Sequence, residues 1–293
     1  MAITRATNVS ALANNAIAAS VLTVREGTVM LPLVWNHTLP QGINQKDIPT
    51  WSQASVASLT DGVEIQDGQS FTPSSTTFTA SEAGALILVT DNAMEDSQDD
   101  VGRLAGEELG GAMAEYYDSQ LMGNFDSFST NALGSAGTEL SVPYVFAAHA
   151  LLHGNSTQRV PRFGKISGVL HTFQYTELEE TIGWPAVSNL ASVPPDIQRQ
   201  ALKAAYVTTI RGIKLFGSNV LSVDGSDDAK GAIFHERALV VVHQRKPRIE
   251  KERNPRLRGW EIVATQRFGH GINQNEWGVE MYFDAATPSG TTI

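Results

Sequence analysis

The chain has 293 residues, of which 42% are hydrophobic and 18% charged, and its formal net charge is −10. A hydrophobic fraction of this size is typical of folded soluble proteins and excludes a mainly disordered chain. The chain contains no cysteine, which excludes disulfides, a thiolate nucleophile and cysteine-ligated zinc. The excess of acidic residues argues against a protein that binds nucleic acid by neutralising phosphates.

The charges are unevenly distributed along the chain. Residues 1–158 contain 17 acidic and 4 basic side chains, whereas residues 159–293 contain 14 acidic and 17 basic ones. The stretch from Arg245 to Arg258 alone holds seven basic residues and two acidic ones. Such a separation occurs on solvated surfaces, but it also suits self-association in which the acidic part of one copy contacts the basic part of the next.

The N-terminal segment predicts an amphipathic helix without a neighbour. The apolar positions near helical spacing within residues 8–24 are Val9, Leu12, Ile17, Val21 and Val24. No second helix follows directly, so this stripe needs a distant or foreign surface to bury against. The segment is too polar for a convincing secretory signal, and no stretch has the roughly 18 consecutive apolar residues of a membrane span.

Residues 29–89 predict short strands separated by turns. The candidate strands are Val29–Trp35, Val63–Ile65, Thr76–Thr79 and Leu86–Thr90. About sixty residues with so few large apolar side chains cannot form a core of their own. We therefore expect an extended two-stranded excursion that lies on another surface.

The strongest local pattern predicts one long helix from about Asp99 to Met122, ending near Gly123. At 1.5 Å per residue it is about 35 Å long. Glycines at positions 102, 106 and 110 fall every four residues. They mark either a close approach by another backbone or an exposed helix face.

The rest of the chain alternates helices and strands. The predicted helices are Val142–His153, Phe173–Glu180 and Asp196–Tyr206, and the predicted strands are Lys165–His171, Ile213–Phe216, Val220–Val223, Ala238–Val242, Trp260–Thr265 and Val279–Phe283. The first part of this region could form a compact αβ domain. The charged stretch is expected to join two of the last strands.

No catalytic constellation stands out. His149 and His153 have the spacing of two ligands on one helix face, but the segment lacks the glutamate of a metalloprotease. The Gly269-His270-Gly271 stretch fails as a dinucleotide fingerprint because Gln274 replaces the third glycine. We therefore expect no enzyme, no cofactor and no metal site.

The order of segments resembles the major capsid proteins of tailed bacteriophages, which have the Hong Kong 97-type fold. Leu88–Met122 (LVTDNAMEDSQDDVGRLAGEELGGAMAEYYDSQLM) looks like the strand, acidic cap and spine helix of that family's P-domain. Gly168–Leu178 (GVLHTFQYTEL) and Ile213–Val223 (IKLFGSNVLSV) resemble A-domain segments. Ala232–Gly269, with its aromatic-Gly end, looks like the closing P-domain strands.

The resemblance implies an α+β fold divided into five segments. They are an N-terminal arm (1–35), an extended β-hairpin loop or E-loop (36–85), the P-domain with its spine helix (86–138), an αβ A-domain (139–230), and the P-domain return strands with the C-terminus (231–293).

The same resemblance implies a virion protein that assembles in the host bacterial cytoplasm. It would associate with itself as hexamers and pentamers in a closed icosahedral shell, enclosing double-stranded DNA without sequence-specific binding. The implied partners are a portal and a separate scaffold protein, because the chain has no room for a fused scaffolding segment; no membrane is involved. Two alternatives remain open, an encapsulin-like nanocompartment shell and a soluble αβ enzyme of unrecognised chemistry.

The resemblance also suggests where copies meet. The loop at about 246–259 would contact its symmetry mates at three-fold positions, with Glu250 and Glu252 of one copy facing basic residues of another. Those basic candidates are Arg248, Arg253, Arg256 and Arg258. The arm, with Leu12, Ile17 and Val21, would bury its apolar stripe on a neighbouring subunit.

Overall fold

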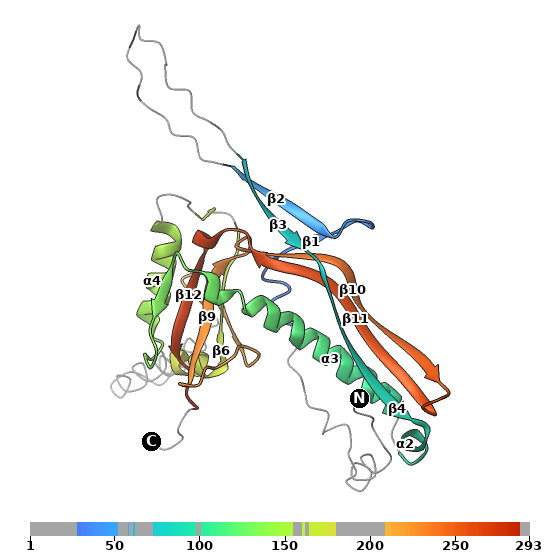
Figure 1. Ribbon diagram of the computed structural model, residues 1–293. Coiled ribbons are helices and arrows are strands. Elements are labelled where there is room, and N and C mark those ends of the chain that lie inside the picture. Colours follow the sequence, from blue (N-terminus) through green and yellow to red (C-terminus); the bar gives the residue numbers. More distant parts are fainter. Residues whose placement is uncertain are drawn as a thin grey trace, which may run out of the picture.

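The computed structural model of the protein describes residues 28–51, 58, 61, 73–97, 101–154, 160–161, 164–179 and 209–287. Two β-sheets and one long helix form an elongated body, from which a β-hairpin projects (Figure 1). The predicted helices at 8–24 and Asp196–Tyr206 and the predicted strand Val63–Ile65 lie outside the described residues.

The first sheet has four strands in the order β1, β10, β11, β4. Their bounds are Trp35–Thr38 (β1), Leu239–Asn254 (β10), Gly259–Ile272 (β11) and Ser81–Thr90 (β4). β10 and β11 form a long antiparallel hairpin, and β4 pairs antiparallel with β11. β1 pairs in parallel with only the first part of β10, from Val240 to His243.

The helix α3, Val101–Met122, runs along one face of this sheet (Figure 1). It confirms the predicted long helix, and its 22 residues span about 33 Å. It buries every fourth residue, namely Ala105, Leu109, Met113, Tyr117 and Leu121. The first three pack with Val89, Ile262 and Ala264 of the sheet. Because helix and sheet share this apolar seam, they form one elongated lobe.

The second sheet has six strands in the order β5, β12, β9, β6, β8, β7. Their bounds are Ala132–Gly134 (β5), Gly278–Asp284 (β12), Asp228–His235 (β9), Ile166–His171 (β6), Ile213–Ser218 (β8) and Thr209–Ile210 (β7). Helix α4, Val142–Gly154, and the helical residues 172–179 pack on one face. The end of α3, the 3₁₀ helix η2 (Phe125–Ser127) and residues 30–34 cover the other face.

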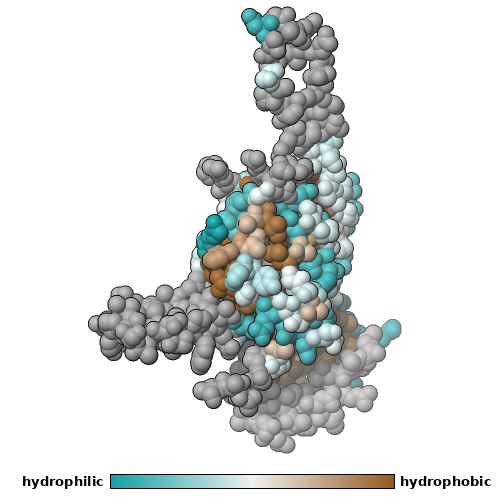
Figure 2. Space-filling model, turned by 90° about the vertical axis from the view of Figure 1, so that its left-hand side faces the viewer, coloured by the Kyte–Doolittle hydropathy of each residue, from teal (hydrophilic) through white to brown (hydrophobic). Residues whose placement is uncertain are grey.

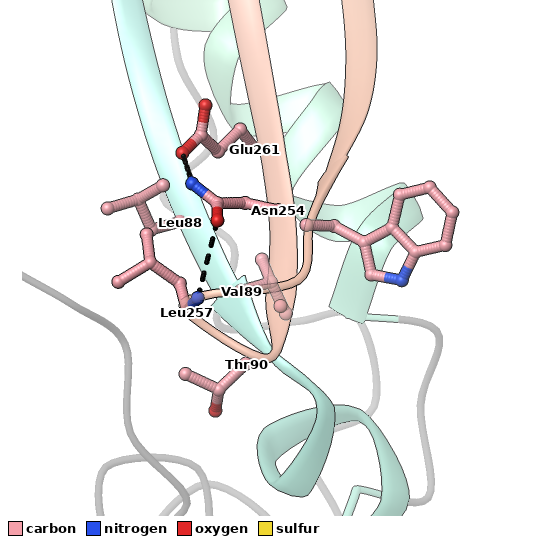
Figure 3. Close-up of a pocket in the computed structure, with 8 residues that line it drawn as sticks. Leu88, Val89, Thr90, Asn254, Leu257 and Glu261 are labelled. Carbon is pink, nitrogen blue, oxygen red and sulfur yellow. Dashed lines mark hydrogen bonds between the residues drawn. The ribbon is translucent and has the colours of Figure 1, made fainter.

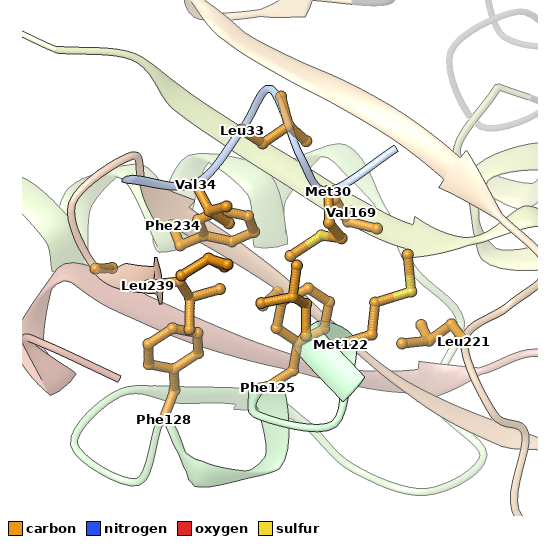
Figure 4. Close-up of a cluster of buried hydrophobic side chains, with 14 of the residues drawn as sticks. Met30, Leu33, Val34, Met122, Phe125, Phe128, Val169, Leu221, Phe234 and Leu239 are labelled. Carbon is orange, nitrogen blue, oxygen red and sulfur yellow. The ribbon is translucent and has the colours of Figure 1, made fainter. Parts of the chain in front are cut away.

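The largest hydrophobic cluster joins the two sheets (Figure 4). Its fully buried aromatic members are Phe125, Phe128 and Phe234. Met30, which follows the N-terminal segment, also lies in this cluster and is 0% exposed. Asp118 of α3, itself buried, accepts hydrogen bonds from the backbone N–H groups of Val29 (2.6 Å) and Met30 (3.3 Å). The start of the described chain is therefore tied to the long helix.

The projecting hairpin consists of β2, Gln45–Trp51, and β3, Pro73–Thr79 (Figure 1). The two strands pair antiparallel along their whole length, which confirms a two-stranded excursion. Ile48 and Phe78 pack with Val240 and Val242 at its base. The sequence pattern did not predict β2, because its residues are mostly polar.

Three predicted elements differ from the structure. Residues 31–33 form a turn in place of the predicted strand Val29–Trp35, with the Leu33 N–H donating to the Met30 carbonyl oxygen (3.0 Å). Val220–Val223 makes one isolated bridge, between Val223 and Ala229. The charged stretch is itself strand up to Asn254, so the turn shrinks to residues 255–258. Regular pairing with β11 satisfies the backbone there and overrides the low strand propensity of charged residues.

The predicted segments do not coincide with the sheets. Segment 139–230 supplies β6, β7, β8 and α4, but the second sheet also takes β5 from 86–138 and β12 from 231–293. Segment 231–293 thus contributes to both sheets, because β10 and β11 lie in the first one.

Candidate assembly interface

The β10–β11 hairpin ends in a four-residue turn beside α2, Asp91–Glu95 (Figure 1). The side chain of Asn254 holds this turn: its Oδ1 accepts hydrogen bonds from the backbone N–H groups of Arg256 (3.1 Å) and Leu257 (3.3 Å). Its Nδ2 donates to Oε1 of Glu261 (2.6 Å; Figure 3). Arg258 closes the turn with a φ of 47°. These contacts give the tip a defined shape before any partner binds.

Strand alternation divides the residues of the charged part of β10 between two faces. One set pairs in register with Ala264, Ile262 and Trp260; its members are Ile249, Lys251 and Arg253. This is the face that α3 covers further along the sheet. The other set pairs with Thr265, Val263 and Glu261; its members are Arg248, Glu250 and Glu252. The predicted interface residues therefore do not form a single cluster, since Arg253 lies on the helix-side face.

The basic residues of the helix-side face are engaged within the protomer. Arg253 donates from both terminal nitrogens to the Asp91 carboxylate, with Nη2–Oδ2 at 2.7 Å. This hydrogen bonding holds the pKa of Asp91 below its usual range. The cationic groups of Lys251 and Arg253 lie 4.4 and 5.5 Å from the Trp260 ring centroid. Arg253 thus joins the hairpin to the start of α2.

The outer face keeps unbalanced charge. Arg248 and Glu250 form an ion pair at 3.2 Å, with both side chains more than half exposed. Glu252 lies directly opposite Glu261, and like charges in that position repel each other. Within the described residues, Glu252, Arg256 and Arg258 form no salt bridge. These three side chains are exposed and available to a partner.

The pocket at the described tip is too small for a ligand. It measures about 10 Å³, enough for one water molecule at most. The lining residues are Leu88, Val89, Thr90, Asn254, Leu257, Gly259, Trp260 and Glu261 (Figure 3). Any functional contact at the tip is therefore made on its outer surface.

Two other sequence expectations concern contacts between copies. Leu12, Ile17 and Val21 lie outside the described residues, so the arm interface stays a prediction. A Cβ added to Gly106 or Gly110 would meet nothing within 4 Å. Their face of α3 is thus open within the described part of the protomer.

The histidine pair on α4 does not form a metal centre with described neighbours. The rings of His149 and His153 lie 4.4 Å apart, and burial, together with His153 and Arg211, lowers the pKa of His149. No group of three potential metal ligands occurs among the described residues. Nor is any helix in the described ranges long and apolar enough to cross a membrane.

The sequence matches no family model and no curated protein, but the structure resembles solved phage particles. The capsid of cyanophage P-SCSP1u aligns with a TM-score of 0.66 at 15% identity, over 89% of this chain and 90% of that one. A chain of the cyanophage Pam1 capsid aligns with a TM-score of 0.69 at 11% identity, over 88% of this chain and 92% of that one. A chain of Mycobacterium phage Cain aligns with a TM-score of 0.63 at 13% identity, over 98% of this chain and 100% of that one.

The chain has the Hong Kong 97-type fold of phage capsid proteins. This capsid fold confirms the α+β class predicted from the order of segments. The similarity extends over most of both chains in each comparison.

Proposed function

We propose that this protein is the major capsid protein of a tailed phage. It assembles as hexamers and pentamers into an icosahedral head that encloses double-stranded DNA, with a portal and a separate scaffold protein as further partners. The observation that carries the proposal is the capsid-protein fold over nearly the whole chain. The elongated form supports it, since a projecting hairpin gains little within one protomer and much against neighbours.

The two sheets and the projecting hairpin then take the roles that the resemblance implies. The first sheet with α3 acts as the P-domain, the second sheet with α4 as the A-domain, and the β2–β3 hairpin as the base of the E-loop. Residues 1–35 act as the N-terminal arm. Its stripe of Leu12, Ile17 and Val21 packs on a neighbouring subunit, so deletion of residues 1–28 should leave a folded protein that does not form shells.

Electron microscopy of the expressed protein tests this function. We expect closed shells with pentameric and hexameric capsomers, and DNA-filled heads when the shells come from phage-producing cells. Small shells that package a protein cargo would instead identify an encapsulin-like compartment. A stable monomer at high concentration on a sizing column would contradict both shell functions.

At the hairpin tip, we propose contacts between symmetry-related copies. Glu252 and the Arg248–Glu250 pair on the outer face of one tip meet Arg256 and Arg258 in the turn of another, while Arg253 keeps its partner Asp91 within the protomer. Arginine suits this contact because its fork can bind a carboxylate through two hydrogen bonds. A desolvated interfacial pair that loses one partner costs about 2–5 kcal/mol, whereas an exposed pair is worth about 0–1 kcal/mol.

Charge reversal tests the tip contact. The Glu250→Lys/Glu252→Lys variant should stay folded, because both side chains are exposed. A lysine at position 252 would face Glu261 and so offset the loss of the Arg248–Glu250 ion pair. Assembly should weaken, and a further Arg256→Glu change should partly restore it. Glu107→Lys, an exposed reversal on α3, is the matched control. Unchanged shell yield and salt resistance of the double-lysine variant would show that the tip contact does not exist.

A further inference from the structure

Helix α4 presents an apolar surface that the described chain leaves uncovered. Val145, Ala148 and Leu152 face the second sheet and are 0% exposed. On the other side, Phe146 is 44% and Leu151 37% exposed. Figure 2 shows this hydrophobic patch on the side of the molecule that carries α4. A helix that is apolar on all sides is normally buried on all sides.

The surface has one cationic neighbour, Arg211. We call the outward-facing surface of this helix the α4 ridge, defined by Phe146, His149, Ala150, Leu151 and His153. The Arg211 guanidinium lies 5.8 Å from the Phe146 ring centroid, and α4 contains no acidic residue. Two ridges brought together would place these cations against each other, so a partner surface should be apolar and acidic.

The same chain carries such a surface where α3 ends. A groove of about 490 Å³, here called the α3-end groove, lies between the last turn of α3, η2 and the loop before β9. Its lining residues are Ser119, Gln120, Met122, Gly123, Asp126, Val220, Leu221, Ser222, Val223, Asp224, Asp228 and Lys230. Apolar side chains therefore alternate with carboxylates in it, and Val223 is 37% exposed.

The groove has a surplus of negative charge. The one cation among its described lining residues, Lys230, forms ion pairs with both Asp126 and Glu280. Asp224 forms no ion pair among the described residues: it accepts hydrogen bonds from the backbone N–H groups of Ser226 and Asp228 and from the Tyr282 hydroxyl, and these bonds lower its pKa. An incoming cation would find this carboxylate at the groove's rim.

Ridge and groove lie on opposite faces of the second sheet. Along β9, Ile233 points into the cluster beneath α4, whereas Ala232 and Phe234 point into the cluster that contains Met122 and Leu221 of the groove. One copy can therefore offer its ridge to a neighbour on one side and its groove to a neighbour on the other. Such a head-to-tail contact generates a ring when its rotation closes.

We infer that the α4 ridge of one copy docks into the α3-end groove of the next, so that the second sheets form a closed ring. The inference rests on the proposed shell function and names a specific contact within each capsomer. Phe146 and Leu151 pack against the apolar part of the groove, and Arg211 approaches Asp126 and Asp224. The apolar contact supplies affinity, and the charges select head-to-tail over head-to-head pairing.

Engineered cysteines test this contact, because the natural chain has none to interfere. In Leu151→Cys/Ser222→Cys shells, mild oxidation should give covalent ladders up to pentamers and hexamers on non-reducing gels. Mixed single variants should stop at covalent dimers. Leu151→Cys/Ser135→Cys, whose second cysteine replaces an exposed serine outside the groove, should give no ladder.

A measurement on the unmodified protein complements the cross-links. Hydroxyl-radical oxidation of Phe146 and Val223 should be several-fold slower in assembled shells than in unassembled protein. Well-formed shells in which both residues oxidise at the unassembled rate, or in which no ladder forms, would overturn the docking contact and leave the shell function intact. A chain that forms no shells under any condition would overturn both.

Discussion

The carboxylate of Asp118 anchors the start of the described chain to α3, and its removal should loosen residues 29 and 30 from this helix. It is 1% exposed and accepts hydrogen bonds from two backbone N–H groups, those of Val29 and Met30. Asp118→Ala leaves both donors without this acceptor. A buried donor without a partner costs about 1–3 kcal/mol, and hydrogen bonds to charged groups are at the upper end.

The two bonds are unequal, because the Val29 contact is 2.6 Å and the Met30 contact 3.3 Å. We expect Asp118→Ala to lower the free energy of unfolding by about 2–4 kcal/mol, and Asp118→Asn, which keeps one acceptor oxygen, by about half as much. Total stabilities of about 5–15 kcal/mol leave such variants folded. Urea unfolding of the unassembled protein measures the loss.

Amide hydrogen exchange at residues 29 and 30 distinguishes this anchor from a general loss of stability. Protection there should fall in Asp118→Ala more than protection in β9 or β11, and shell yield should fall with it. Glu107→Ala is the control on the same helix, since its exposed pair with Arg103 is worth about 0–1 kcal/mol. Unchanged exchange at residues 29 and 30 would refute the anchoring role of Asp118.

Two further perturbations address the first lobe. Leu109 lies at the centre of the seam between α3 and the first sheet and is 2% exposed. Leu109→Ala should lower the free energy of unfolding, measured in urea, by about 2–5 kcal/mol. A decrease below about 1 kcal/mol would mean that the helix does not pack there. Burial lowers the pKa of His243 from 6.5, so the unfolded state binds more protons in mild acid and stability should fall as the pH drops from 7.5 to 5.5. His243→Gln should reduce that loss, and an unchanged pH slope would exclude His243 as a source.

Local sequence patterns were sufficient for several helices and strands. The apolar spacing of α3, the helix start at Pro143 in α4 and the short apolar-rich runs of β6 and β8 predicted these elements with nearly correct bounds. The capsid-protein fold was predicted from the order of these segments, since their order and length are properties of the chain.

Pairing between distant residues decided the rest. β2 and the charged part of β10 have weak strand patterns, and they are strands because β3 and β11 supply hydrogen-bonding partners. The ion pair of Arg253 with Asp91 joins residues 162 positions apart. Sheet register places Glu250 and Arg253 on different faces of the first sheet. It also places the α3-end groove opposite the α4 ridge on the second sheet. Only the folded chain sets that register, because it depends on which segments lie side by side.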